Sequence, residues 1–292
     1  MSKMIIMQGL PASGKSTRAE ELVREMGNAV RINKDLLRKM LHFEKFNGRN
    51  EGLTRDAARA LARTFLTSDV NVIIDDTNLN PGTLQSWKDL AKELEAKVEV
   101  CKMDTPYQEC IERDRKRQNA VGDHVIYQMA MQNGLLPKQE FVICDIDGTL
   151  ADATHRLHFL YDDVPNLIEK KSKDWKGFFA GLGADGFRSE VWNQVVKEGA
   201  DVILVSARPE EYRYPTMSWL ADQGILHGQH YKTLIMRKSG DSRDDDIIKR
   251  EIAERFFAGH TIRKVFDDRP RVIRMWRELG LEVVDVGNGK EF

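Results

Sequence analysis

The chain begins with an apolar segment that is followed directly by a glycine-rich loop. Of all its sequence features, this combination restricts the possible folds of the chain most strongly. MIIMQ (4–8) has the composition of a buried strand, GLPASGKS (9–16) matches G-x-x-x-x-G-K-[ST], and a helical stretch follows over 15–26. In that order, the loop amides and the helix N-terminus all point at one anion. The opening therefore predicts a nucleotide-binding α/β domain.

The first half continues this alternation of strands and helices. Further strands are expected at 71–75 and 97–103, and helices at about 81–96 and 106–118, each opening on a proline. Proline suits the first helical turn because its missing amide proton has no partner there anyway. Continuously apolar strands that alternate with helices are typical of a parallel sheet covered on both faces.

The second half repeats the pattern after a break. GLLPKQE (134–140) is expected to be a linker, since its glycine and proline end a helical stretch. Strands are then expected at 141–147, 201–206, 233–237, 264–268 and 281–286. We therefore predict an α/β protein of two domains, 1–137 and 138–292, each a parallel sheet covered by helices. Residues 151–187 fit the alternation poorly and are expected to form a lid or insertion over a site.

Composition narrows the class of protein without naming a partner. The 292 residues are 41% apolar and 31% charged, as in ordinary globular proteins, and the net charge of −1 gives no strong field for nucleic acid. The apolar runs are far shorter than the ~18 residues of a membrane helix. No signal-peptide pattern opens the chain, so we expect no membrane association and a cytoplasmic location. The three cysteines, an odd number, are expected to be reduced thiols.

The glycine-rich loop is predicted to bind ATP with Mg²⁺. Lys15 would reach the terminal phosphates and Ser16 would hold the metal. The alternative is a glycine-rich turn without a ligand. The residues expected to contact ATP here are Gly9, Leu10, Pro11, Ala12, Ser13, Gly14, Lys15, Ser16 and Thr17.

A kinase also needs a base for the incoming hydroxyl and cations near the transferred phosphoryl group. Asp35 and Arg38 are three residues apart and share a helix face, so they could supply the base and a grip on a substrate phosphate. A surface ion pair at a helix start is the alternative. Asp75 and Asp76 end a buried strand, where they could orient Mg²⁺ or an arginine, or cap the next helix.

Two further groups of arginines, one pair and one set of three, are spaced four residues apart, as on one face of a helix. Arg113 and Arg117 could close over ATP as a lid, or lie on a solvated basic face. Arg55, Arg59 and Arg63 could follow a nucleic-acid backbone, or form an exposed helix face.

A second candidate site follows the strand that opens the second half. In FVICDIDGTL (141–150), Asp145 and Asp147 are two residues apart and would face the same side of a strand. Two carboxylates this close need a cation such as Mg²⁺. Asp145 could attack phosphorus and form an aspartyl-phosphate, while Asp147 protonates the leaving oxygen and later deprotonates water.

Three later segments supply the remaining parts of this second site. Ser206 and Arg208 follow one strand and could bind phosphate oxygens. Asp267 and Asp268 follow another and could complete a Mg²⁺ shell. Lys249, on an intervening helix, could pair with the nucleophile.

These motifs together resemble two known families. FVICDIDGTL, VSAR, GDSRDDDIIKREI and VFDDRPRVIRMWRELG are similar to the haloacid dehalogenase superfamily of phosphotransferases over most of 141–286. GLPASGKST, INKDLLR, DDTNLNP and RDRKR resemble the 5′-hydroxyl polynucleotide kinases. Kinase first and phosphatase second is the order in the polynucleotide kinase-phosphatases of tailed bacteriophages.

The resemblance implies a role for each matching kinase residue. Asp35 looks like the general base for the 5′-hydroxyl, and Arg38 like the group that holds the adjacent phosphate of the acceptor strand. Asp76, rather than its neighbour, looks like the site aspartate. Arg117 looks like the lid arginine on ATP, with Arg113 beside it.

The resemblance assigns the phosphatase residues in the same way. Asp145 looks like the nucleophile and Asp147 like the acid/base. The phosphate and Mg²⁺ partners are then Ser206, Arg208, Lys249, Asp267 and Asp268. Residues 151–187 depart from the family pattern, so the choice of phosphatase substrate is open there. His155 and Arg156 in this stretch are either substrate contacts or ordinary loop residues.

The function implied is that of a bifunctional end-healing enzyme. It would transfer the γ-phosphate of ATP to a 5′-hydroxyl of RNA or DNA, remove 3′-phosphates, and leave ends suited to a ligase. The resemblance also implies a homo-oligomer and, for a phage protein, the cytoplasm of the host. The alternatives are a kinase and phosphatase of free nucleosides or other small metabolites, or a nucleotide-gated binding protein whose second domain is silent.

Overall fold

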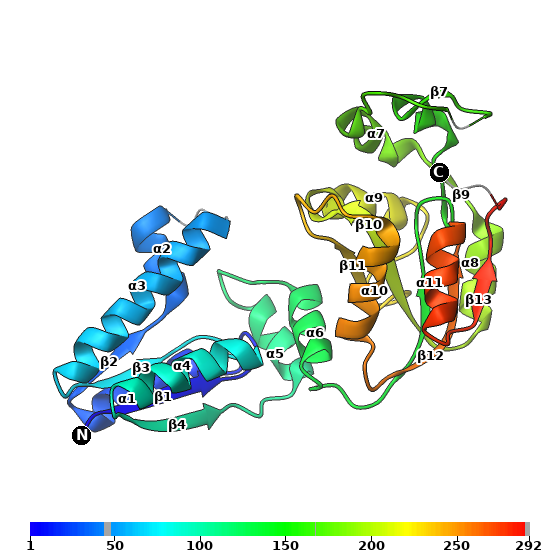
Figure 1. The fold of residues 1–292 in the computed structure, drawn as a ribbon. Coiled ribbons are helices and arrows are strands. Elements are labelled where there is room, and N and C mark those ends of the chain that lie inside the picture. The colour runs from blue at the N-terminus through cyan, green and yellow to red at the C-terminus, as the bar shows by residue number, and fades with distance from the viewer. Residues whose placement is uncertain (44–47, 167, 290–292) are drawn as a thin grey trace. The chain divides into compact units, whose positions relative to one another are not determined.

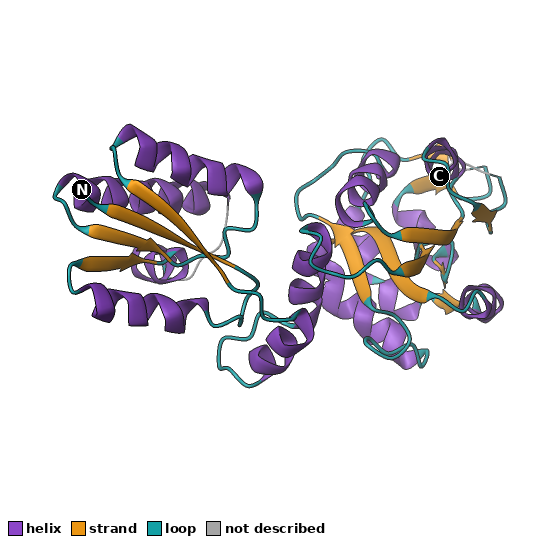
Figure 2. Cartoon of the chain, turned by 90° about the horizontal axis from the view of Figure 1, so that it is seen from below, coloured by secondary structure: helices purple, strands orange, loops and turns teal. Residues whose placement is uncertain are grey.

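The computed structural model describes residues 1–43, 48–166 and 168–289 of the chain. The chain divides into two compact units, residues 1–135 and 136–292. Each unit is built on a parallel sheet with helices on both of its faces (Figures 1 and 2). The predicted α/β architecture of two helix-covered parallel sheets is therefore confirmed. Within the described ranges, no helix has the length and apolar character needed to cross a membrane.

The first unit carries a four-stranded sheet in the order β2-β3-β1-β4, with every pairing parallel. Its elements are β1 (Lys3–Gln8), α1 (Lys15–Met26), β2 (Ala29–Ile32), α2 (Lys34–His42), α3 (Gly48–Thr67), β3 (Asn71–Ile74), α4 (Pro81–Glu93), β4 (Lys97–Lys102), α5 (Tyr107–Arg115) and α6 (Asp123–Gln132). Because β1 and β3 are neighbours, the glycine-rich loop and the Asp75–Asp76 pair leave the sheet side by side.

The alternation of side chains along β1 explains why helices cover both faces. Met4 and Ile6 are fully buried in one cluster, together with Ala58 of α3 and Trp87 of α4. Their neighbours along the strand belong to a different cluster, in which Ile5 packs with residues of α1. Successive strand residues face opposite sides, so an uninterrupted apolar strand needs cover on each side.

The second unit has a five-stranded parallel sheet in the order β11-β10-β5-β12-β13. Its sheet strands and main helices are β5 (Glu140–Cys144), α8 (Ser189–Lys197), β10 (Asp201–Pro209), α9 (Arg213–Asp222), β11 (Thr233–Arg237), α10 (Asp245–Phe256), β12 (Thr261–Asp267), α11 (Pro270–Glu278) and β13 (Val283–Asp285). Cys144 pairs with Leu204 of β10 and Phe266 of β12. Asp145 therefore emerges at the middle of the sheet edge.

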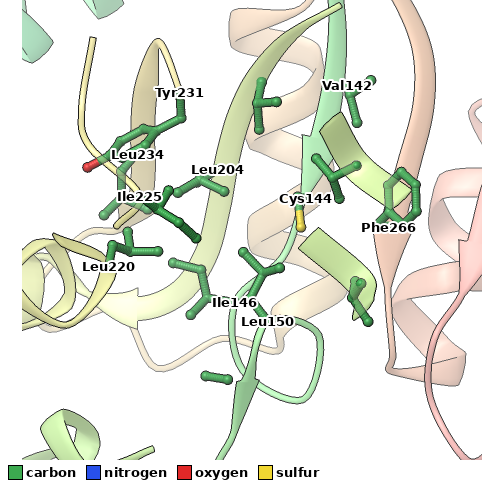
Figure 3. Packing of buried hydrophobic residues seen from close by; sticks show 14 of the residues in the cluster. Val142, Cys144, Ile146, Leu150, Leu204, Leu220, Ile225, Tyr231, Leu234 and Phe266 are labelled. Carbon is green, nitrogen blue, oxygen red and sulfur yellow. The ribbon is translucent and has the colours of Figure 1, made fainter. Parts of the chain in front are cut away.

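One apolar cluster anchors this central strand (Figure 3). Val142 and Cys144 of β5 pack with Leu204, Leu220 and Phe266, and all five side chains are at most 1% exposed. A close-packed core of this kind fixes the backbone that follows it. The core thus holds the segment from Asp145 onward in place relative to β10 and β12.

Residues 151–187 form small elements of their own. Described in order, these are β6 (Ala151–Asp152), η1 (Thr154–Phe159), β7 (Tyr161–Asp163), β8 (Ile168–Glu169), α7 (Trp175–Ala180), η2 (Leu182–Ala184) and β9 (Gly186–Phe187). Strands β6 and β9 pair antiparallel, as do β7 and β8. Leu160, Tyr161 and Phe178 make a small apolar cluster here. We refer to residues 151–187 as the insert; its α7 and β7 are labelled in Figure 1.

Several observed elements differ from the sequence predictions. The strand expected at 141–147 ends at Cys144, so Asp145 and Asp147 lie beyond it rather than on one face of it. The helices expected at 81–96 and 106–118 end at Glu93 and Arg115. Strand β2 was not predicted, because AVRI is four residues long and contains Arg31. Strand β10 runs on to Pro209 beyond the predicted end at 206, with a register shift between Ser206 and Pro209.

Candidate active sites

The glycine-rich loop has a shape that only glycine permits at two positions. A Cβ on Gly9 would lie 2.9 Å from Ser13 Oγ and 3.0 Å from Met103 Cβ. Gly14, directly before α1, has φ +95°, a left-handed conformation that L side chains rarely adopt. The loop therefore turns tightly and presents the N-terminus of α1, as a phosphate-binding loop requires.

Lys15 is buried against this loop. Its ammonium donates hydrogen bonds to the Leu10 carbonyl and, at 3.3 Å, to Ser13 Oγ. Burial lowers the pKa of Lys15 to about 8, against the opposing effects of Asp75 and Asp76. A phosphate at this position would give the ammonium the anionic partner that the loop carbonyl does not supply.

Asp75 and Asp76 lie at the end of β3, next to the loop. Asp75 accepts from Arg31 Nε at 2.8 Å, and Asp76 accepts from the Lys34 amide at 3.0 Å. One oxygen of each carboxylate, Asp75 Oδ1 and Asp76 Oδ2, is buried without a hydrogen-bond partner, and burial raises the pKa of Asp76. Asp76 Oδ2 also lies 3.6 Å from Lys34 Nζ. Carboxylate oxygens are ligands that suit a hard cation such as Mg²⁺.

The structure places both aspartates near the loop, although the resemblance pointed to Asp76. Asp75 acts more strongly on Lys15 than Asp76 does. Both aspartates therefore lie within electrostatic reach of Lys15.

Asp35 and Arg38 pair on α2, and a third residue joins them. Asp35 has an 83% exposed side chain, and its Oδ1 accepts from Arg38 Nη1 at 2.6 Å. Arg38 also binds Glu51 of α3 through Nε and Nη2, the latter at 2.9 Å. Glu51 was not predicted, because nothing in the sequence marks a contact thirteen residues away. The exposed Asp35 carboxylate is accessible to a hydroxyl, while the arginine is held in place.

Helix α5 carries Arg113 but ends at Arg115, so the prediction that Arg113 and Arg117 share one helix face is wrong, although both lie near the loop. Arg113 Nη1 lies 3.6 Å from the position that a Cβ on Gly14 would occupy. Arg117 is close enough to Lys15 to lower its pKa, and its Nε donates to Asp114 at 2.5 Å. Asp114 is fully buried and was not predicted. Arg113 also pairs with Glu109 and its side chain is 47% exposed, so it lies at the surface beside the loop.

The three arginines predicted to form a stripe on α3 lie in two different environments. Arg63 pairs with Glu93 at 2.8 Å, on the surface. Arg59 donates to Ser86 Oγ at 2.6 Å. Together with Arg55 and Lys34, Arg59 lines a cavity of 460 Å³. The structure therefore does not present the stripe as one continuous basic surface.

In the second unit, Asp145 lies in a buried ionic cluster. Lys249 Nζ is 2.8 Å from Asp145 Oδ1 and 2.7 Å from Asp267 Oδ2. Burial raises the pKa of Asp145, and Lys249 opposes this effect. Burial alone would lower the pKa of Lys249, but Asp145 and Asp267 hold it above its usual value. The ammonium therefore stays charged beside the predicted nucleophile.

Three carboxylates of this cluster are close enough together to hold a cation. Asp145, Asp267 and Asp268 each offer an oxygen, and these atoms lie within 4.8 Å of one another. Burial and the charge of Asp267 raise the pKa of Asp268 to about 7. Lys249 and Arg269 bring two positive charges to three carboxylates, so the donor set fits Mg²⁺. A Cβ on Gly148 would lie 2.0 Å from Asp268 Oδ2, which leaves only glycine room there.

Asp147 does not join this group, although it was predicted as a metal ligand too. It is not among the three carboxylates that offer oxygens at that site. Arg208 donates to it through Nε at 2.7 Å and Nη2 at 2.8 Å, and Arg156 Nη2 donates at 2.5 Å. Burial alone would raise the pKa of Asp147, but the two arginines hold it well below its ordinary range.

A fourth residue completes this second ionic cluster. Asp185, fully buried at the end of the insert, accepts from Arg156 Nε and Nη2, both at 2.7 Å, and from Arg208 Nη2 at 3.0 Å. We call Asp147, Arg156, Arg208 and Asp185 the arginine cluster. Arg156 is 0% exposed and is buried between the Asp147 and Asp185 carboxylates. His155 stays at the surface and contacts the Gly181 carbonyl.

Ser206 is fully buried within β10. Its Oγ accepts a hydrogen bond from the Arg208 amide at 3.1 Å. The hydroxyl proton of Ser206 remains available to donate to a phosphate oxygen.

A cavity of 1230 Å³ joins these groups. Asp145, Asp147, Arg208, Lys249 and Asp268 line it from the sheet edge. Much of the remaining wall comes from the insert and includes Leu157, Leu160, Tyr161, Val164, Trp175, Phe178 and Phe179. The cavity therefore has a charged end at the carboxylates and an apolar end on the insert.

Comparison with known proteins gives separate matches for the two units. Residues 4–134 match a family described as "AAA domain", and residues 179–291 match the family "Polynucleotide kinase PNKP phosphatase domain". Most of the insert falls outside both segments. A curated relative from Autographa californica nuclear polyhedrosis virus, "Putative bifunctional polynucleotide kinase/RNA ligase", is 24% identical over 97% of this chain and 42% of its own length.

Two further relatives are similar over different extents. The "L-seryl-tRNA(Sec) kinase" of Methanococcus maripaludis is 26% identical over 56% of this chain and 64% of its own length. The chain thus spans less than two thirds of either curated relative. A solved chain from "Structure of the Pnkp1/Rnl/Hen1 RNA repair complex" is 27% identical, with a TM-score of 0.42 and coverage of 99% of this chain and 97% of that one. The chain thus has an AAA-like segment followed by one similar to the polynucleotide kinase-phosphatase family's phosphatase domain.

Proposed function

We propose that this protein is a bifunctional nucleic-acid end-healing enzyme. Residues 1–137 would transfer the γ-phosphate of ATP to 5′-hydroxyl ends of RNA or DNA. Residues 138–292 would remove 3′-phosphates, with 151–187 as a lid. The observation that supports the proposal is that one chain carries two groups of residues, of different chemistry, that suit phosphate. One is the glycine-rich loop with Lys15, and the other is the buried cluster of Asp145, Lys249 and Asp268.

In the kinase reaction, the residues of this chain would bind and align two substrates. The loop amides and Lys15 hold the phosphates of ATP, and Arg113 and Arg117 lie where they can neutralise charge on the transferred group. Asp35 takes the proton of the 5′-hydroxyl, whose oxygen forms the new bond to phosphorus as the bond to ADP breaks. Arg38 would hold the adjacent phosphate of the acceptor strand.

In the phosphatase reaction, the two carboxylates would divide the work. The Asp145 carboxylate attacks phosphorus, and the 3′-oxygen leaves with a proton from Asp147. Water then hydrolyses the aspartyl-phosphate, giving its proton back to Asp147 and releasing inorganic phosphate. Arg156 and Arg208 favour the ionised form of Asp147, so it can carry this proton only when a substrate phosphate draws arginine contacts away.

Mg²⁺ fits both sites. Ser16 with Asp75 and Asp76 would hold it in the first, and Asp145, Asp267 and Asp268 in the second. When bound, it would neutralise negative charge on the phosphate oxygens.

The products define the partners. A 5′-phosphate and a 3′-hydroxyl are the ends that a ligase joins, and one relative carries both kinase and RNA ligase in its name. We propose a functional link to a ligase and, from the family resemblance, a homo-oligomeric state and a phage origin. Its place of action would be the cytoplasm.

A phosphate-transfer assay that follows both ends of one oligonucleotide tests the proposal. An oligonucleotide with a 5′-hydroxyl and a 3′-phosphate is incubated with γ-labelled ATP and Mg²⁺, and label at the 5′ end and phosphate released from the 3′ end are measured. Both signals are expected. If only mononucleotides or other small compounds reacted, the assignment to nucleic-acid ends would be wrong.

A further inference from the structure

The insert carries an exposed aromatic residue on the wall of the phosphatase cavity. Trp175, the first residue of α7, is 50% exposed and lines the cavity that also contains Asp145. Its indole lies against Phe179 in a stacked arrangement, with ring centroids 6.0 Å apart. Phe179 in turn stacks on Tyr212 at 4.6 Å. Phe179 thus supports one side of the indole, Lys173 Nζ lies 5.9 Å from the ring centre, and half of the Trp175 surface stays exposed.

A chain of contacts fixes this platform relative to the reacting groups. The Trp175 and Phe178 rings are 5.8 Å apart, and the Arg156 guanidinium lies 4.0 Å from the centre of the Phe178 ring. Arg156 also donates to the Phe178 carbonyl and to Asp147. The aromatic wall is therefore linked to the acid/base carboxylate through one buried side chain, so a substrate held at Asp145 lies within the same enclosure.

The size and charge of the cavity indicate what fills the apolar end. Its volume of 1230 Å³ exceeds the ~300–1,000 Å³ usual for small-ligand sites, and a phosphate alone needs far less. Eight acidic and eight basic side chains line it, so they sum to no net charge. A long polyanion would gain little from such a wall. A planar apolar group attached to the phosphate would gain from the aromatic residues.

We propose that Trp175 is a stacking platform for the nucleobase of the 3′-terminal nucleotide. This inference rests on the proposed 3′-phosphatase function and names what recognises its substrate. Every nucleobase has a π face, so stacking tolerates any sequence and provides binding where charge does not. The phosphatase would then recognise the terminal nucleoside alone rather than several nucleotides of the strand.

The test pairs a substrate change with a matching change in the protein. Two oligonucleotides with 3′-phosphates are compared, one with an ordinary terminal nucleotide and one whose terminal sugar lacks a base. For the wild-type protein, kcat/KM should be about 5- to 150-fold higher with the base, the range for loss of one base–aromatic stack. W175A should act on the two substrates equally, and W175F should retain part of the preference.

Two controls separate stacking from loss of structure. Tyr214 is 82% exposed and does not line the cavity, so Y214A should keep the wild-type preference. Kinase activity, measured on the same preparations, should be unchanged in all three variants. A wild-type protein indifferent to the base, or a W175A variant that keeps the preference, would overturn the inference. Failure of the wild type to release phosphate from either substrate would overturn the proposed function itself.

Discussion

Asp185 offers a sharp test of how the phosphatase site is organised, because it does not line the cavity yet binds both arginines that hold Asp147. Asp185→Asn keeps the shape of the side chain and removes its charge. Breaking a buried ion pair by changing one partner costs ~3–5 kcal/mol. Because the amide oxygen can still accept one hydrogen bond, we expect a loss of about 3 kcal/mol in the unfolding free energy of the second unit.

The same substitution should also slow catalysis. With Asp185 neutral, the guanidinium groups of Arg156 and Arg208 lose their shared anchor and shift relative to Asp147. A displacement of ~1 Å can cost ~100-fold in rate, so we expect a fall in phosphatase kcat of about that size. Kinase activity in the same chain should not change.

The assay combines phosphate release with amide hydrogen exchange. Exchange protection is compared between residues 1–135 and 136–289, so that the first unit serves as an internal reference. Asp162→Asn is the matched control, since Asp162 is an exposed aspartate of the insert strand β7. A D185N variant with the kcat and protection of D162N would refute the role assigned to the arginine cluster.

Three further predictions concern both sites. Gly148→Ala should abolish phosphatase activity and spare the kinase in a two-ended assay, because the new Cβ would meet the Asp268 carboxylate at 2.0 Å. Glu51→Gln should raise the KM for the 5′-hydroxyl oligonucleotide about 10-fold and leave the KM for ATP unchanged, because Arg38 loses a charged partner. Lys15 is cationic below its pKa of about 8, so calorimetry should show ATP affinity falling as pH rises from 8 to 9.5; Lys15→Met should lack this slope.

Much of the fold followed from periodicity alone. The apolar runs 4–8 and 233–237 became strands, and the helix at 15–26 begins and ends as expected. The hydrophobic pattern of these segments is regular because the two strands are buried on both faces and the helix is buried along one face. Strand β2 escaped prediction since a four-residue run containing Arg31 has too little pattern to distinguish a strand from a loop.

The candidate sites divide in a similar way. Residues in compact motifs, such as Lys15 and Asp145, could be identified because loop and strand geometry fix their positions. Asp185 and Glu51 could not, since their partners are 29 and 13 residues away in sequence and depend on tertiary packing. Arg156 was left open for the same reason, and only its burial between two carboxylates decides its place.

The proposed function requires that one chain carry two independent phosphate-transfer sites. Asp35→Ala and Asp145→Asn are each given a 5′-hydroxyl, 3′-phosphate oligonucleotide with ATP and Mg²⁺, and the products are resolved by mass. The account predicts that Asp35→Ala yields a 5′-hydroxyl, 3′-hydroxyl product and that Asp145→Asn yields a 5′-phosphate, 3′-phosphate product. Loss of both reactions in either variant, while that variant remains folded by hydrogen exchange, would contradict it.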